Sequence, residues 1–211
     1  REILTGTKNQ KIIEKCIFNI GITLELKSIK NANKLPISGF YRGNPFFTPP
    51  FISINNENNS LANAVTIFDS LSQSSNSKVE AKLRLAEIKF RALGDLDGAF
   101  KIYTNILKSI KNSSIRKNCI LKMIEINIAK GDIPSAKSKI EQFADLFDDK
   151  NDRNNFRMKY AQILMFEGAK DSLNNYLRDS MKFMDSTNDN FNDVLELVFG
   201  IFKMEILNFK D

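Results

Sequence analysis

The stretch LAEIKFRALGDLDGAFKIYTNIL, residues 85–107, decides the fold of this chain. Its apolar residues recur three and four positions apart on both sides of Gly94, which is the spacing of one face of an α-helix. A glycine adopts the positive φ that closes a helix without a steric penalty. The carboxylate of the adjoining Asp95 can then accept from the first free N–H groups of a second helix. The stretch therefore predicts two helices that fold back on each other at Gly94.

The same pattern returns along the chain at a fixed spacing. Gly131 and Gly168 follow Gly94 at intervals of 37 residues (131 − 94 = 37 and 168 − 131 = 37). The columns after the glycines are apolar in every copy: Ala99, Ala136 and Leu173 stand five residues on, and Tyr103, Ile140 and Leu177 stand nine residues on. The third copy is weaker, because Ala169 replaces the capping aspartate. Repetition at such a period indicates an array of helical hairpins.

The first copy resembles the tetratricopeptide-repeat (TPR) family. The shared pattern is an aromatic residue, a Gly-Asp turn, a small residue and a second aromatic residue, carried here by Phe90, Gly94, Asp95, Ala99 and Tyr103. The resemblance covers about half of the chain, although the family's period is ~34 residues. Together with the spacing, it leads us to expect an all-α fold, an α-solenoid of three to four stacked antiparallel helix hairpins.

We expect four segments along the chain. Residues 1–33 form an N-terminal helix, the first helix of a degenerate repeat, and residues 34–57 form an insertion. Residues 58–184 form the hairpin array, which begins with SLANAVTIFDSL at 60–71, a copy of the second-helix pattern. Residues 185–211 form a C-terminal helix, capped by Asp189 or Ser186, that closes the array or starts a further repeat.

The insertion is rich in proline and aromatic residues. Four of the five prolines lie within residues 36–51 and exclude a helix there. The aromatic residues of the same stretch predict contact with another surface, because exposed aromatic patches are rare on soluble monomers; they are Phe40, Tyr41, Phe46, Phe47 and Phe51. Two interpretations stay open: the loop folds back over the N-terminal hairpin, or it docks on another subunit.

The TPR resemblance also implies a binding groove. Ligands of that family lie against the first helix of each hairpin, on the concave face, and the corresponding positions here are Arg84, Ile88, Arg91, Leu121, Glu125, Ile128, Met158, Gln162 and Met165. The family's chaperone-tail readers hold a terminal carboxylate with an asparagine, where this chain has Ile88, Glu125 and Gln162. The groove is therefore better suited to a helix or an extended peptide than to an anion.

The composition argues against catalysis and cofactors. The chain has no histidine and two cysteines, Cys16 and Cys119, so it offers neither a disulfide framework nor a zinc site of cysteine and histidine. Its paired aspartates sit at expected turns and helix ends, where capping explains them. No phosphate-binding or dinucleotide-binding motif occurs. We therefore predict no catalytic residue, no cofactor and no metal, and a protein that is not an enzyme.

The favoured function is a non-catalytic scaffold or adaptor for protein–protein interaction, a subunit or fragment of a larger assembly. Its partners are other proteins, bound as a peptide or helix in the groove or as subunits at the end helices, since the run 197–202 is apolar on every face. Two alternatives stay open: an RNA-binding array like the pentatricopeptide repeats, or the regulatory region of a larger enzyme. Nucleic acid is disfavoured, because the net charge of +6 arises from interspersed charges of both signs.

No apolar stretch approaches the ~20 residues of a transmembrane helix. A cytoplasmic and a periplasmic or envelope-associated location both fit.

Overall fold

The computed structural model describes residues 9–29, 44, 46, 49–55, 59–73, 78–147, 150–182, 184 and 190–208, with the backbone alone at 150, 151 and 201–208. These residues form helices and a single isolated antiparallel bridge, between Ile29 and Ile54. The predicted all-α fold of stacked helix hairpins is confirmed. The helices divide between two compact units: unit 1 comprises Arg1–Arg42 and Pro50–Ile110, and unit 2 comprises Gly43–Pro49 and Lys111–Asp211.

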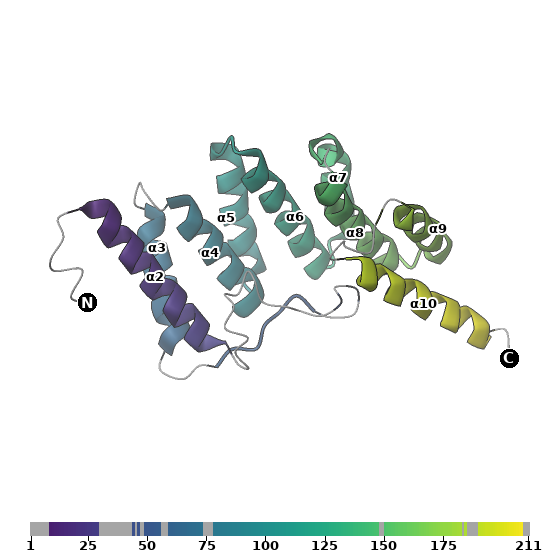
Figure 1. Ribbon diagram of the computed structural model, residues 1–211, viewed down its shortest axis with the longest axis horizontal. Coiled ribbons are helices and arrows are strands. Elements are labelled where there is room, and N and C mark those ends of the chain that lie inside the picture. The colour runs from purple at the N-terminus through teal and green to yellow at the C-terminus, as the bar shows by residue number, and fades with distance from the viewer. Residues whose placement is uncertain are drawn as a thin grey trace. The chain divides into compact units, whose positions relative to one another are not determined.

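Unit 1 is a run of helices that pack on their neighbours in chain order (Figure 1). They are α2 (Gln10–Ser28), α3 (Ser60–Gln73), α4 (Lys78–Glu87), the π-helix η3 (Ile88–Ala92) and α5 (Leu96–Ser109). Helix α3 lies against both α2 and α4, and α4 lies against α5. The core between them is apolar and closes around Phe68, which is fully buried and meets the ring of Phe18 edge-on at 5.4 Å between centroids.

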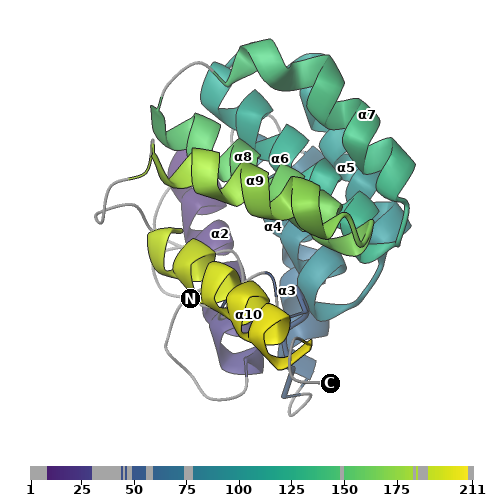
Figure 2. The ribbon, with the colours of Figure 1, turned by 90° about the vertical axis from the view of Figure 1, so that its right-hand side faces the viewer.

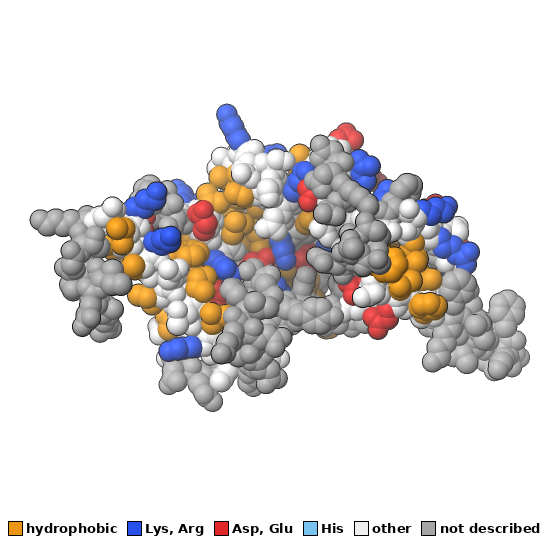
Figure 3. Space-filling model, in the orientation of Figure 1, with side chains coloured by type: hydrophobic (Ala, Val, Ile, Leu, Met, Phe, Trp, Pro, Cys, Tyr) orange, Lys and Arg blue, Asp and Glu red, His pale blue; other side chains and the backbone are white. Residues whose placement is uncertain are grey.

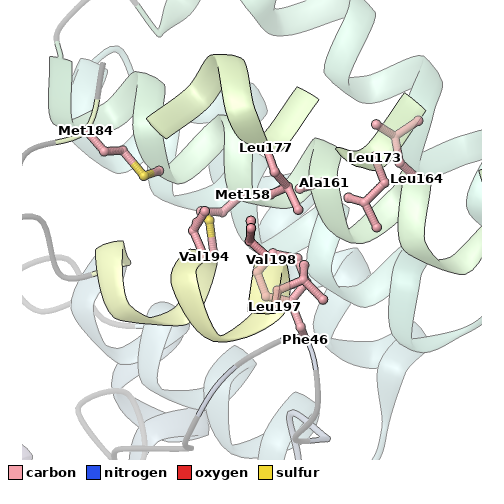
Figure 4. Packing of buried hydrophobic residues seen from close by; sticks show 10 residues of the cluster. All are labelled: Phe46, Met158, Ala161, Leu164, Leu173, Leu177, Met184, Val194, Leu197 and Val198. Atoms are coloured by element: carbon pink, nitrogen blue, oxygen red, sulfur yellow. The ribbon is translucent and has the colours of Figure 1, made fainter. Parts of the chain in front are cut away.

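Unit 2 is also built of helices that pack on one another. Its elements are α6 (Ser113–Ala129), α7 (Ile133–Phe143), the 3₁₀-helix η4 (Ala144–Leu146), α8 (Lys150–Phe166), α9 (Lys170–Met181) and α10 (Phe191–Asn208). Helix α8 packs on α6, α7 and α9, and α10 packs on α9, in the foreground of Figure 2. The core of α8, α9 and α10 also takes in the side chain of Phe46, which lies beside Leu197 (Figure 4).

The three glycines end their helices as predicted. Gly94, Gly131 and Gly168 have φ values of +67°, +73° and +69°, the left-handed conformation that glycine adopts readily. Asp95 then accepts a hydrogen bond from the N–H of Gly98 at 2.9 Å, and Asp132 accepts one from Ser135 at 3.2 Å. Lys89 lies 2.6 Å from the Asp95 carboxylate, and this hydrogen bond is the main cause of that carboxyl's lowered pKa.

The first reversal contains one residue more than the others. In the second, the N–H of Asp132 bonds to the carbonyl of Asn127, five residues back, and in the third Ala169 bonds to Leu164 over the same span. In the first, Asp95 reaches back six residues to Lys89, because η3 inserts a π turn. The sequence columns around the glycines do not indicate this extra residue.

Small residues let the helices of each pair come close. Ala64, Ala99 and Ala136 are all completely buried, at equivalent places early in α3, α5 and α7. Phe68 and Tyr103, four residues further on, are also fully buried. Residues 60–71 thus bury a small and an aromatic side chain at the same spacing as α5 does.

Two further expectations concern the chain's ends and membranes. The predicted caps of the C-terminal helix, Asp189 and Ser186, lie outside the described residues. Within the part of the chain that the structure describes, none of the helices is both long and apolar enough to cross a bilayer.

A stabilising substitution is expected at the third reversal, where α9 begins without a side-chain cap. The backbone of Ala169 (φ −79°, ψ 66°) matches that of Asp132 (φ −83°, ψ 68°), but Ala169 makes no side-chain cap. Ala169→Asp should therefore raise the free energy of unfolding by about 1 kcal/mol, since an aspartate cap satisfies an exposed N–H of the first turn. Urea unfolding followed by far-UV circular dichroism measures it. The reciprocal change Asp132→Ala should lower stability by a similar amount, and an unchanged or lower midpoint for Ala169→Asp would contradict the prediction.

The two cysteines should react at very different rates. Cys119 is fully buried in α6, and desolvation raises the pKa of its thiol to about 11, so almost no thiolate forms near pH 8. Cys16 on α2 is half-buried. Titration of the native chain with an aromatic disulfide reagent at pH 8 should modify one thiol quickly and the second only in denaturant. A Cys16→Ser variant should lose the fast phase; two fast thiols in the native chain would be inconsistent with this packing.

Candidate functional site

The predicted groove residues of unit 1 lie on α4 and η3, and two of the three are buried. Arg84 is partly exposed and forms an ion pair with the fully buried Glu25 of α2, with 3.7 Å between Nη1 and Oε1. Ile88 is fully buried and Arg91 is 1% exposed. The face that these residues share is therefore covered rather than open.

A buried polar cluster underlies that face. The hydroxyl of Tyr103 on α5 donates to Oε1 of Glu87 at 3.1 Å, and Oε2 of Glu87 lies 4.0 Å from Nη1 of Arg91. Arg91 also donates from Nε to the main-chain oxygen of Pro50 at 3.3 Å. A buried guanidinium needs such partners, because removing it from water is costly. The sequence did not predict this cluster, although Glu87 and Arg91, opposite charges one helical turn apart beside the apolar Ile88 and Phe90, are a signal that could have indicated it.

The cover over η3 is the end of the insertion, residues 50–55, which we call the strap. The N–H of Ile52 donates to the carbonyl of Arg91 at 2.8 Å, and the N–H of Asn55 donates to the carbonyl of Ser28 at 2.6 Å. Ile54 forms the antiparallel bridge with Ile29 at the end of α2. Residues 50–55 thus fold back on the N-terminal helices of their own unit, as the first interpretation of the insertion expected.

The side chains of the strap alternate as in a β-strand. Ile52 is buried and Ile54 half-buried, whereas Ser53 between them is exposed. Phe51 is 48% exposed, and its ring meets that of Phe90 edge-on at 6.4 Å between centroids. The strap is therefore bound as an extended peptide, with one face inward and one toward solvent.

The remaining aromatic residues of the insertion have other surroundings. Phe46 is 4% exposed and belongs to the core of unit 2. Asn44, two residues before Phe46, donates from Nδ2 to the main-chain oxygen of Asp193 at 3.1 Å and to Oε2 of Glu196 at 2.8 Å. Burial and the neighbouring Glu196 raise the pKa of the Asp193 carboxyl. The predicted contact residues Phe40, Tyr41 and Phe47 lie outside the described residues.

In unit 2 the predicted groove residues meet where α6 faces α8. Oε2 of Glu125 lies 3.3 Å from Nζ of Lys122 and 4.0 Å from Nζ of Lys159, and Lys159 also donates to Oε1 of Gln162 at 3.1 Å. Glu125 and Gln162, 37 residues apart, are thus joined by one lysine. Their exposed fractions are 8% and 6%. Met158 is buried in the core, while Leu121, Ile128 and Met165 are half-buried.

A cavity of about 390 Å³ lies between η4 and the start of α8. Its lining residues are Ala144, Asp145, Phe147, Arg153, Phe156 and Arg157. The rings of Phe147 and Phe156 stack at 4.3 Å, and Arg153 donates from Nε to the main-chain oxygen of Phe147 at 3.4 Å. No cluster of three or more metal-ligating side chains occurs among the described residues.

Several large apolar side chains are exposed on the described helices. Phe199 on α10 is 67% exposed, Phe166 at the end of α8 is 57% exposed, and Ile12 and Ile20 on α2 are 45% and 40% exposed. Figure 3 shows hydrophobic side chains gathered over unit 2 near the start of α10. A contiguous apolar patch such as the one near the start of α10 is typical of surfaces that contact other proteins, whereas single exposed apolar side chains are common on any protein.

Comparisons with known proteins give one family. A family model for the 26S proteasome subunit RPN7 matches residues 69–211. Among curated proteins, a subunit of the nuclease SbcCD from Staphylococcus aureus strains JH9 and JH1 is 29% identical over 136 residues, covering 57% of this chain. The chain spans 13% of the length of those relatives. Since the family model extends from within α3 through α10, this chain belongs to the family of the 26S proteasome subunit RPN7.

Proposed function

We propose that this chain is a non-catalytic scaffold within a larger protein assembly, in which its helices hold other protein subunits. The family supports the proposal, because it is named for a subunit of a multi-protein complex. Functional residues of such a scaffold are contact surfaces rather than reactive groups, so exposed apolar side chains are the relevant evidence.

The exposed side chain of Phe199 is the main support for the proposal. Its neighbours on α10, Val194, Leu197 and Val198, are between 0% and 8% exposed and fix the helix on the core of unit 2, whereas Phe199 points away with 67% of its surface exposed. A phenylalanine on a rigid helix loses little conformational freedom on binding and buries a large apolar area. It therefore suits the centre of a protein interface.

The predicted contact residues divide into contacting and supporting groups. The insertion residue Phe51 and the groove residues Arg84, Leu121, Ile128 and Met165 retain exposed surface and belong to the proposed contact surfaces of their units. The other groove residues support those surfaces from beneath by fixing the first helices of the hairpins; they are Ile88, Arg91, Glu125, Met158 and Gln162.

Site-specific photo-crosslinking in the native cell tests this proposal. With a benzophenone amino acid in place of Phe199 in the full-length protein, illumination should produce discrete adducts with one or a few proteins, because the side chain would lie in an interface. The matched control is the same substitution at Gln142, which is exposed on α7. Adducts with nucleic acid, or no difference between positions 199 and 142, would count against a protein scaffold.

A further inference from the structure

The strap contacts η3 in the way a peptide ligand contacts its receptor. Its main chain supplies the N–H of Ile52 to the carbonyl of Arg91 and the carbonyl of Pro50 to the Arg91 side chain. Main-chain bonds of this kind are the usual source of affinity when an extended peptide is recognised, and inward side chains at alternate positions add specificity. Here Ile52 and Ile54 provide that alternation.

The π turn leaves the main-chain carbonyl of Arg91 available to accept a hydrogen bond from the strap. In an α- or π-helix the carbonyl of Arg91 would accept from the N–H of Asp95 or Leu96, but those groups bond instead to Lys89 at 2.8 Å and to Gly94 at 2.9 Å. The Arg91 carbonyl is therefore left for a donor from outside the helix, and Ile52 supplies it. Single π turns of this kind recur at functional sites.

We propose that the η3 face, formed by η3 and the end of α2 at Ile29, is a binding site for an extended peptide, and that the strap occupies it in cis as a displaceable inhibitor. The partner that it fits is an extended segment of another protein with an aromatic residue followed by two aliphatic residues at alternate positions, the pattern of Phe51, Ile52 and Ile54. The inference rests on the proposed scaffold function, since it adds regulation to one of its contact surfaces.

The short tether explains why the strap holds the site. Asn55 lies five residues before Ser60, where α3 begins, so the strap remains near η3 even when released. A short tether gives an effective concentration on the order of millimolar, which a free competitor must exceed. The strap is held to unit 1 by hydrogen bonds at Pro50, Ile52 and Asn55 and by the bridge at Ile54, without a helix or sheet of its own. Segments of that kind open locally without global unfolding.

A peptide-binding experiment on the full chain tests the inference. The probe is a fluorescent synthetic peptide of residues 49–55, PPFISIN, followed by anisotropy. The double variant Ile52→Asp, Ile54→Asp should release the strap, because two carboxylates cannot remain on its apolar inward face. This variant should bind the peptide at least about tenfold more tightly than the wild-type chain. A peptide carrying the same two aspartates should not bind.

The matched control is Ser53→Asp, which places a charge on the outward face of the same strap. It should bind the probe as weakly as the wild-type chain. If the double variant keeps its helical circular dichroism and still binds no better than this control, the η3 face is not a peptide site and the inference is overturned.

If the double variant loses its helices, hydrogen exchange of the wild-type chain tests instead whether the strap opens while unit 1 stays folded. The amide of Ile52 should exchange faster than that of Tyr103 in α5, since strap opening would precede unfolding of unit 1. Equal slow exchange would show that the strap opens only with the whole unit, which overturns the inference. Crosslinking at Phe199 on α10 is independent of the strap, so a failure here leaves the proposed scaffold function standing.

Discussion

The structure depends on one local constraint, a chain reversal in which a glycine with positive φ closes a helix and the next residue begins another. At Gly131 and Gly168 the reversal satisfies end carbonyls of the first helix through the N–H groups of the glycine and its successor, with bonds between 2.9 and 3.1 Å. Helix ends otherwise leave such groups unpaired. Because the reversal is tight, consecutive helices must lie side by side, and the buried alanines, including Ala99 and Ala136, set how closely they approach.

Most of the fold could be predicted from the sequence because these constraints are local. The glycine conformation, the caps at Asp95 and Asp132 and the small residues each depend on a few adjacent positions that repeat every 37 residues. The π turn of η3 could not be predicted, since it adds a residue within the helix without changing the place of Gly94. For the insertion, the sequence left folding back and docking on another subunit both open. The particular partners of Phe46 and of the strap could not be predicted, because neither segment has helical periodicity and both contact residues far along the chain.

The candidate site was harder to predict than the fold, because the partners of its buried polar residues lie outside the repeat positions. Glu125 and Gln162 occupy the same place in the repeat, but Lys159, which joins them in the structure, lies outside the positions counted from the glycines. In unit 1, Arg91 was one of the predicted groove positions, and an extended segment of the chain lies against it. That segment is the chain's own strap, which sequence spacing alone did not connect with Arg91.

The insertion and the π turn are best understood as a coupled pair. Without the π turn, the carbonyl of Arg91 would accept a hydrogen bond within its own helix, and the N–H of Ile52 would lose its acceptor. Without the strap, the carbonyl of Arg91 would lose the Ile52 donor and its guanidinium would lose the Pro50 acceptor. Buried polar groups without partners are costly, so either feature alone would destabilise unit 1. A partner that displaces the strap must therefore supply the same main-chain donor and acceptor. This requirement selects an extended segment over a helix, because the N–H and carbonyl groups within a helix are already paired.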